Sequence, residues 1–177
     1  MRCFTAVDFP LEIKESLHNI QLRIGDEAAN VKWVDKENLH VTLKFLGELN
    51  ELKIAKAVEA QEKIKFTPFE LTIDEIGVFP NENYVNVVWV GFKDTEALFE
   101  LHKKVDISLS KLLPMEREFL GHITIGRVKN VMDKQQFISS LKLDVPKQSF
   151  KVDSFRLYSS ELTSEGPKYT VLKEFSG

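Results

Sequence analysis

The spacing of apolar residues along the chain predicts alternating strands and amphipathic helices. Apolar side chains three or four positions apart form one face of a helix, and this spacing recurs in four stretches. The predicted helices are 13–24, 51–64, 98–112 and 133–141. Asn50 and Asp133 are suited to cap the second and fourth of them, because their side chains can accept from free backbone N–H groups. Runs of apolar and β-branched residues predict strands at 4–8, 39–45, 69–76, 83–92, 122–128, 150–158 and 169–175.

The order of these elements repeats once. Strand, helix, histidine-containing strand, helix and strand follow one another twice, with His40 corresponding to His122 (122 − 40 = 82) and Phe69 to Phe150 (150 − 69 = 81). A near-constant offset is typical of a duplicated unit and predicts a pseudo-two-fold architecture. We expect one domain, 1–177, built from units at about 1–80 and 81–177.

Two short motifs carry the candidate chemistry. They read His40-Val41-Thr42-Leu43 and His122-Ile123-Thr124-Ile125. Residues i and i+2 of a strand share a face, so each motif presents an imidazole and a hydroxyl side by side. Strict alternation would also place Lys44 on this face and would turn Phe45 into the core with the other apolar residues.

Paired imidazoles suit phosphoryl chemistry. Imidazole titrates near neutral pH, so one ring can accept a proton from water while the other gives one to a leaving oxygen. Threonine hydroxyls can donate to phosphate oxygens. A single His-x-Thr motif usually belongs to an ordinary strand edge, whereas its repetition favours a role in catalysis or binding. The other histidines, His18 and His102, lie in predicted helices without such partners, and we expect them at the surface or its boundary.

Composition narrows the classes of function. The net charge is −3, whereas proteins that coat long nucleic acids are usually basic; a site for one phosphate at an RNA end remains compatible. Cys3 is the only cysteine, so no internal disulfide can form, which is typical of a cytoplasmic protein. No ligand spacing typical of zinc and no phosphate-binding glycine loop occurs, so we expect neither a metal nor another cofactor. No apolar run approaches a membrane-spanning length, and we expect no membrane association.

The sequence around both motifs resembles a known family. The phrases Asn38-Leu39-His40-Val41-Thr42-Leu43-Lys44-Phe45-Leu46-Gly47 and His122-Ile123-Thr124-Ile125-Gly126-Arg127-Val128 are similar to those of 2H phosphoesterases. The branch they resemble is the RNA 2',3'-cyclic phosphodiesterases, also called 2'-5' RNA ligases. The opening Arg2-Cys3-Phe4-Thr5-Ala6-Val7 and the segments 158–162 and 166–169 resemble it too, so the likeness covers essentially the whole chain.

This resemblance implies both a fold and an activity. It implies an α+β fold with two pseudo-symmetric lobes, each an antiparallel sheet with helices on its outer face, around a central cleft. It implies hydrolysis of RNA 2',3'-cyclic phosphodiester ends to a 2'-phosphomonoester, with 2'-5' ligation as the reverse reaction. His40 would be the proton donor and His122 the acceptor, while Thr42 and Thr124 would bind the substrate.

Arg127 corresponds to an arginine that members of the family use on phosphate. Strict alternation puts Arg127 on the face opposite His122, so it would need a β-bulge near Gly126 to reach the site. A surface arginine is the alternative. Gly121 is a departure, because the family commonly has proline just before the second histidine; we expect a slightly lower rate and unchanged chemistry.

Several questions stay open at this stage. The expected partner is an RNA end with a 2',3'-cyclic phosphate, for which tRNA halves are one source, bound by a monomer. The alternatives are a 2H phosphoesterase acting on another cyclic phosphate, such as a cyclic nucleotide or ADP-ribose cyclic phosphate, and a non-catalytic module that binds RNA ends. The aromatic residue that stacks on the terminal base is also undecided among Phe9, Phe79 and Tyr84.

Overall fold

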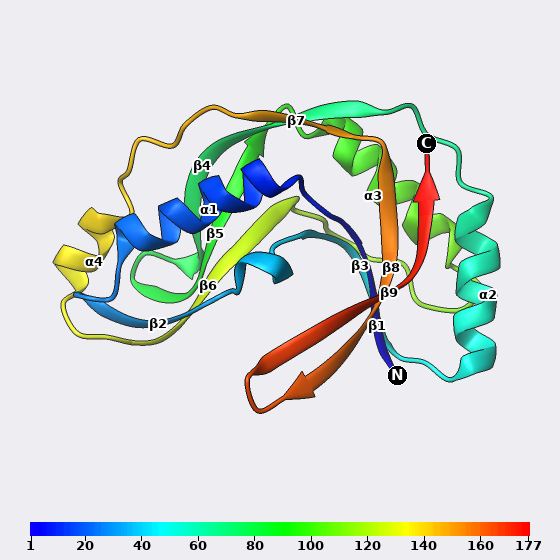
Figure 1. Ribbon diagram of the computed structural model, residues 1–177, viewed down its shortest axis with the longest axis horizontal. Coiled ribbons are helices and arrows are strands. Elements are labelled where there is room, and N and C mark those ends of the chain that lie inside the picture. The colour runs from blue at the N-terminus through cyan, green and yellow to red at the C-terminus, as the bar shows by residue number, and fades with distance from the viewer.

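Nine strands form two antiparallel sheets, and four α-helices pack against them, in the computed structural model, which describes residues 1–177 (Figure 1). The strands are β1 (Arg2–Val7), β2 (Ala29–Trp33), β3 (Val41–Glu48), β4 (Phe69–Asn81), β5 (Tyr84–Lys93), β6 (His122–Val131), β7 (Ser149–Val152), β8 (Ser154–Thr163) and β9 (Gly166–Ser176). The helices are α1 (Leu11–Ile24), α2 (Glu51–Glu62), α3 (Glu96–Ser108) and α4 (Lys134–Ser140), with a 3₁₀ turn at Lys36–Asn38. The α+β class is therefore confirmed.

Each sheet contains one of the histidine motifs. The first sheet has the strand order β3-β1-β8-β9, and the second has the order β2-β6-β5-β4-β7. Both sheets combine strands from the two sequence halves, so neither sheet corresponds to one half. The motif strands nevertheless occupy similar places, since β3 pairs with β1 as β6 pairs with β5. The duplication of units 1–80 and 81–177 stays a prediction.

Helices cover the apolar face of each sheet. The buried residues of α1 are spaced at helical intervals and pack in front of the second sheet beside α4, while α2 and α3 lie against the first sheet (Figure 1). Both predicted N-caps are confirmed: Asn50 Oδ1 accepts from the N–H of Lys53 and Asp133 Oδ1 from that of Gln136, each at 2.9 Å. No helix combines the length and apolarity needed to cross a membrane.

The observed elements depart from the pattern chiefly in three places, and β4 and β8 also continue five residues beyond their predicted ends (81 − 76 and 163 − 158). Strand β2 was not predicted, because its five residues are too few for a clear alternation. The predicted strand 150–158 is two strands: β7 pairs with β4 in the second sheet, and after Asp153 the chain enters the first sheet as β8. Helix α3 ends at Ser108 although apolar spacing continues through a turn to Leu112.

A β-bulge comes directly after the threonine of each motif. In β3, Thr42 pairs with Ala6 and Lys44 with Thr5, so Leu43 is an extra residue without a partner in β1. In β6, Thr124 pairs with Trp89 and Gly126 with Val88, so Ile125 is extra in the same way. Both bulges occupy the third position after the histidine, and each reverses the faces of the later residues of its strand.

The bulge in β3 makes one prediction wrong. Lys44 does not share the face of His40; its side chain is 2% exposed and forms an ion pair with Asp106 of α3 at 2.5 Å. Phe45, expected in the core, is 70% exposed and lies near Phe4 on the face of the motif. Alternation predicted the reverse because a bulge shifts the period by one residue.

Candidate active site

His40 is held with one ring nitrogen directed at the backbone and the other free for chemistry. Its Nδ1 lies 2.6 Å from the carbonyl oxygen of Asn38. A carbonyl oxygen can only accept, so Nδ1 carries the hydrogen, and Nε2 is the atom that gains or loses a proton. Nε2 lies 3.0 Å from Oγ1 of Thr42. Buried Leu39 and Val41 fix the backbone on either side.

His122 repeats this arrangement on the other sheet. Its Nδ1 lies 2.7 Å from the carbonyl oxygen of Leu120, again two residues earlier, so its Nε2 is also the exchanging nitrogen. Ile123 and Ile125 are fully buried on the opposite face of β6 and fix the strand against α1. Thr124 lies on the face of His122 but forms no hydrogen bond with it, in contrast to the pair formed by Thr42 and His40.

The two histidines are close enough to influence each other. Burial lowers the pKa of His40 and is the largest effect on it. The hydrogen bond to Asn38 and the carboxylate of Asp8 act to raise this pKa, while the charges of Lys14 and His122 act to lower it. The two side chains therefore lie near each other although their motifs belong to different sheets.

Aromatic rings surround both histidines. The ring of His40 lies 4.9 Å from Phe4 and meets the edge of Tyr169 at 5.4 Å, measured between ring centroids. The ring of His122 meets Phe79 edge-on at 5.1 Å and lies 6.3 Å from Trp89. These contacts limit the orientations open to each imidazole.

Two glycines make room for Trp89 beside His122. A Cβ atom on Gly77 would lie 2.0 Å from the indole, and one on Gly91 would lie 2.9 Å from it. The ring therefore lies flat across β4 and β5, which is possible only because both positions lack a side chain. The flat indole continues the face on which His122 and Thr124 are presented.

The bulge at Ile125 brings Arg127 to the face of the motif. Arg127 pairs with Val87, which lies on the same face of β5 as Gly91, the partner of His122. Burial raises the pKa of Tyr169, and the nearby charge of Arg127 lowers it. The charge of Arg127 therefore lies close enough to act on a residue of the first sheet. The bulge that the sequence required for this orientation is present.

The sequence identified only part of the aromatic surroundings. Of the three candidates, Phe79 contacts His122, Phe9 is buried against Phe150, and Tyr84 is exposed at the start of β5. Phe4 and Tyr169 were missed, although both lie in segments that resemble the family. Phe4 lies in β1, next to the motif strand β3, and Tyr169 lies in β9 at the other edge of the sheet, so their approach to His40 could not be derived without the tertiary structure.

Two further expectations can be compared with the structure. His102 is 5% exposed, so its assignment to the surface or boundary is wrong; its Nδ1 donates to the carbonyl of Leu43 at 2.7 Å. His18 is half-buried on α1 and contacts Gln21, as expected for a boundary residue.

At Gly121, a Cβ atom would lie 2.5 Å from Cδ2 of Leu98, so glycine allows the close approach of α3.

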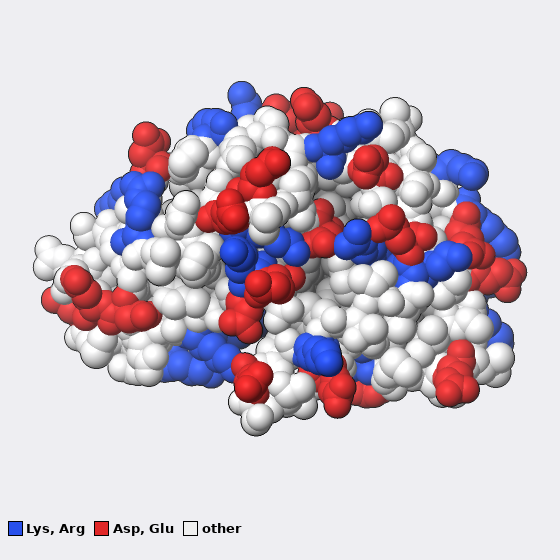
Figure 2. All heavy atoms as spheres, in the orientation of Figure 1, with Lys and Arg blue, Asp and Glu red and all other residues white.

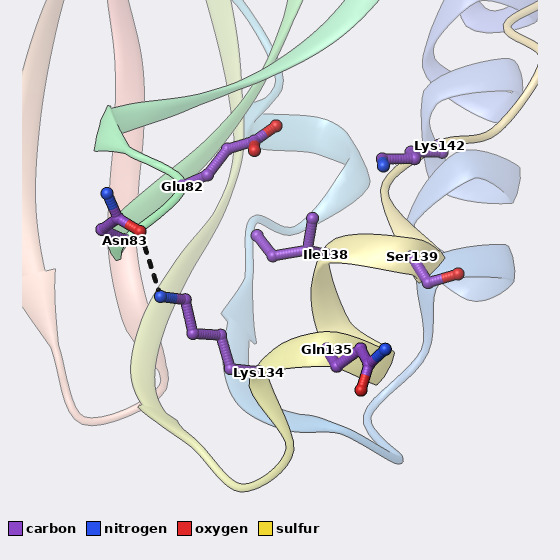
Figure 3. A pocket seen from close by; sticks show the side chains of 7 residues that line it. All are labelled: Glu82, Asn83, Lys134, Gln135, Ile138, Ser139 and Lys142. Atoms are coloured by element: carbon purple, nitrogen blue, oxygen red, sulfur yellow. Dashed lines mark hydrogen bonds between the residues drawn. The ribbon is translucent and has the colours of Figure 1, made fainter.

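Neither the surface charge nor a polar pocket near α4 identifies a second site with paired histidines. Acidic and basic side chains are interspersed over the face shown in Figure 2, in agreement with the small net charge. A polar pocket between the β4–β5 turn and α4 contains neither motif (Figure 3). It is lined by Glu82, Asn83, Lys134, Gln135, Ile138, Ser139 and Lys142.

Comparison with known proteins decides the family. The family described as LigT like Phosphoesterase matches residues 7–89 and 91–169, which include both motifs. The chain belongs to the LigT-like phosphoesterases. A curated relative from Methanocaldococcus jannaschii, an RNA 2',3'-cyclic phosphodiesterase, is 39% identical over 99% of this LigT-like chain and 100% of its own length.

Solved structures agree with this assignment. A protein from Thermus thermophilus superposes with a TM-score of 0.83 at 28% identity, covering 99% of this chain and 97% of its own. E. coli LigT in its apo form gives a TM-score of 0.80 at 27% identity, covering 99% and 96%. E. coli LigT has also been solved in complex with phosphate and with 3'-AMP.

Proposed function

We propose that this LigT-like phosphoesterase hydrolyses the 2',3'-cyclic phosphodiester at RNA ends to a 2'-phosphomonoester. One observation carries the proposal: two imidazoles on different sheets have the same tautomer and lie close enough for the charge of one to act on the pKa of the other. Such a pair can remove one proton and deliver another in a single displacement at phosphorus. The full-length similarity to an RNA 2',3'-cyclic phosphodiesterase supports this substrate.

In the proposed reaction the two histidines have opposite roles. Neutral His122 accepts a proton from water at Nε2 as the water oxygen forms a bond to phosphorus. The bond from phosphorus to the 3'-oxygen breaks, and His40 donates its Nε2 proton to that oxygen. The products are a free 3'-hydroxyl and a phosphate on the 2'-oxygen. When the 5'-hydroxyl of a second RNA attacks phosphorus in place of water, the same two proton transfers join the ends through a 2'-5' bond.

Three further side chains are assigned to the phosphate. Thr42 and Thr124 donate hydrogen bonds to the non-bridging oxygens, where negative charge grows during attack. Arg127 adds a permanent positive charge from the second sheet. Because imidazolium protonates the leaving oxygen, the mechanism assigns no step to a metal or another cofactor.

The charge of the substrate has a further role at His40. Burial favours the neutral form of this ring by lowering its pKa, whereas a general acid must be protonated. A phosphodiester anion beside Nε2 favours the imidazolium form. Binding of substrate therefore favours protonation of His40, the general acid, whereas His40 stays largely neutral in the free enzyme.

The expected partners and location follow from this activity. RNA ends with a 2',3'-cyclic phosphate are the substrates, and tRNA halves are one natural source of them. We propose a monomer, because each chain holds both motifs. We also propose a cytoplasmic location, since the only cysteine, Cys3, is buried and free.

The test is product analysis on a short RNA with a 2',3'-cyclic phosphate end. We expect a 2'-phosphate as the only product, with turnover unchanged by EDTA. A 3'-phosphate product would refute the assigned bond cleavage. Preference for a cyclic mononucleotide or ADP-ribose cyclic phosphate would favour another substrate class, and binding without turnover would favour a non-catalytic RNA-end module.

A further inference from the structure

The carbonyl group of each bulge residue is bound by a buried side chain from a helix. Leu43 accepts from Nδ1 of His102 at 2.7 Å, and Ile125 accepts from Nε2 of Gln21 at 2.8 Å. His102 is 5% exposed and Gln21 is 2% exposed. Neither side chain takes part in the proposed reaction, so each occupies a buried polar position that catalysis does not explain.

The amide of Gln21 has all its hydrogen bonds formed. Its Nε2 donates to the carbonyls of Val34 and Ile125, both at 2.8 Å, which uses both amide hydrogens. Its Oε1 lies 3.0 Å from Nδ1 of His18, one turn earlier on α1. This arrangement fixes the direction of the amide and connects α1 to the bulge in β6.

The ring of His102 is fixed in a different way. It stacks on Phe119 with a centroid distance of 4.0 Å and an interplanar angle of 5°. Nδ1 must donate to Leu43, because a carbonyl cannot donate in return. Phe119 lies shortly before His122, so the same ring also contacts the loop that leads to the second motif.

These two contacts are related by the internal repeat. Gln21 and His102 are 81 residues apart (102 − 21), close to the 82 residues that separate His40 from His122. Helix α1 of the first half holds the motif of the second half, and α3 of the second half holds the motif of the first. Each motif is therefore supported by a donor from the opposite half of the chain.

We propose that Gln21 and His102 are matched positioning residues that hold the bulge after each His-x-Thr motif and so aim its imidazole and hydroxyl. The proposal rests on the function proposed above. A bulge leaves backbone groups outside the regular ladder, and a buried carbonyl without a donor is costly. Loss of His102 should let the bulge at Leu43 move and should mainly misdirect His40. Loss of Gln21 should let the bulge at Ile125 move and should mainly misdirect His122.

The experiment compares apolar and donor-retaining variants. Gln21→Met and His102→Met each remove the side-chain donor to one bulge, and Gln21→Met also removes the hydrogen bond to Val34. His102→Gln keeps an N–H that can reach Leu43. Gln148→Met is the matched control, because Gln148 is a half-buried glutamine whose Oε1 accepts from Oγ of Ser16 at 2.6 Å and which forms no hydrogen bond with either bulge. We expect about a 10-fold or larger fall in kcat for the first two variants, since a misplacement of catalytic groups by about 1 Å can cost that much or more. His102→Gln should recover most of kcat, and Gln148→Met should lose stability only.

A second substrate separates positioning from general destabilisation. Replacing the bridging 3'-oxygen by sulfur gives a leaving group that needs no proton, so a misaimed His40 no longer matters. We expect the defect of His102→Met to shrink on this substrate and that of Gln21→Met to persist. Equal defects on both substrates, or losses that only track the unfolded fraction, would overturn the proposal.

Histidine NMR signals test the same idea without turnover. In the free proteins, His102→Met should shift the ring signals of His40 more than those of His122, and Gln21→Met should do the opposite. Unchanged signals in both variants would also overturn the proposal. The two variants could show these shifts although the wild-type protein does not hydrolyse cyclic-phosphate RNA. In that case the proposed function fails while the positioning role stands.

Discussion

The carbonyl oxygen of Asn38 lies 2.6 Å from Nδ1 of His40, two residues further along the chain. This contact decides which nitrogen is available for proton exchange, because the carbonyl requires a hydrogen on Nδ1 and leaves Nε2 to gain or lose a proton. Leu120 has the same relation to His122. The backbone itself thus selects one tautomer at both motifs.

The roles of the two histidines can be separated with the sulfur-bridged substrate. We expect His40→Ala to lose activity on the normal RNA and to recover most of it when the leaving atom is sulfur, because a thiolate leaves without protonation. His122→Ala should stay slow on both, since its water is not activated. Single-turnover rates on the two substrates measure this. Recovery of His122→Ala instead would reverse the assignment.

The lowered pKa of His40 predicts a pH-dependent loss of stability. A histidine in the unfolded chain has a pKa of about 6.5, whereas the pKa of His40 in the folded protein is lower, so folded His40 takes up its proton only at lower pH. The free energy of unfolding should therefore fall as pH decreases from about 6.5 toward the folded pKa of His40. Urea unfolding at several pH values measures this. His40→Asn should reduce the dependence, and His18→Asn serves as the control; an unchanged slope in His40→Asn would contradict the prediction.

The threonines should contribute less than the histidines. Removing one donor to a developing oxyanion costs up to about 10²–10³-fold in kcat, so Thr42→Ala and Thr124→Ala should remain measurably active. Thr→Ser at either position should keep most of the rate, because the hydroxyl is retained. Steady-state kinetics and thermal unfolding together test this. Unfolding of both alanine variants would identify the threonines as structural residues.

Arg127 should act on substrate binding and on the charged transition state. Arg127→Ala should lower kcat/KM by about 10-fold or more, since a hydrogen bond to a charged group contributes about 1.5–3 kcal/mol. Arg23→Ala is a suitable control, because Arg23 is an exposed arginine on α1. The salt dependence of KM should weaken only in the Arg127 variant. Equal behaviour of both variants would make Arg127 an ordinary surface residue.

The ion pair of Lys44 and Asp106 gives a prediction about stability. Both side chains are almost fully buried, so Lys44→Met leaves a buried carboxylate without its cation and should cost about 3–5 kcal/mol of unfolding free energy. The double variant Lys44→Met/Asp106→Leu should recover most of this loss, because apolar pairs replace buried ion pairs well. Denaturant titrations of the wild-type protein and the two variants measure the difference. A double variant as unstable as the single one would contradict the argument.

The amino-acid sequence was sufficient for the features that depend on neighbouring residues. Helical spacing located α1 and α2 closely, and the capping residues Asn50 and Asp133 marked two helix starts, because both signals lie within a turn of the chain. The repeated His-x-Thr motif identified His40 and His122 as a pair. The family was recognised from the same short phrases and agrees with the similarity over the full chain.

The backbone conformation directly after each motif was settled by tertiary contacts alone. Alternation predicts faces correctly as long as every residue has a partner in the next strand, and Leu43 and Ile125 have none. Whether a bulge forms depends on the register of neighbouring strands and on donors such as His102 and Gln21, which are distant in sequence. The burial of Lys44 and the orientation of Arg127 therefore could not be derived locally, because the contacts that fix them exist only after the two halves have packed together.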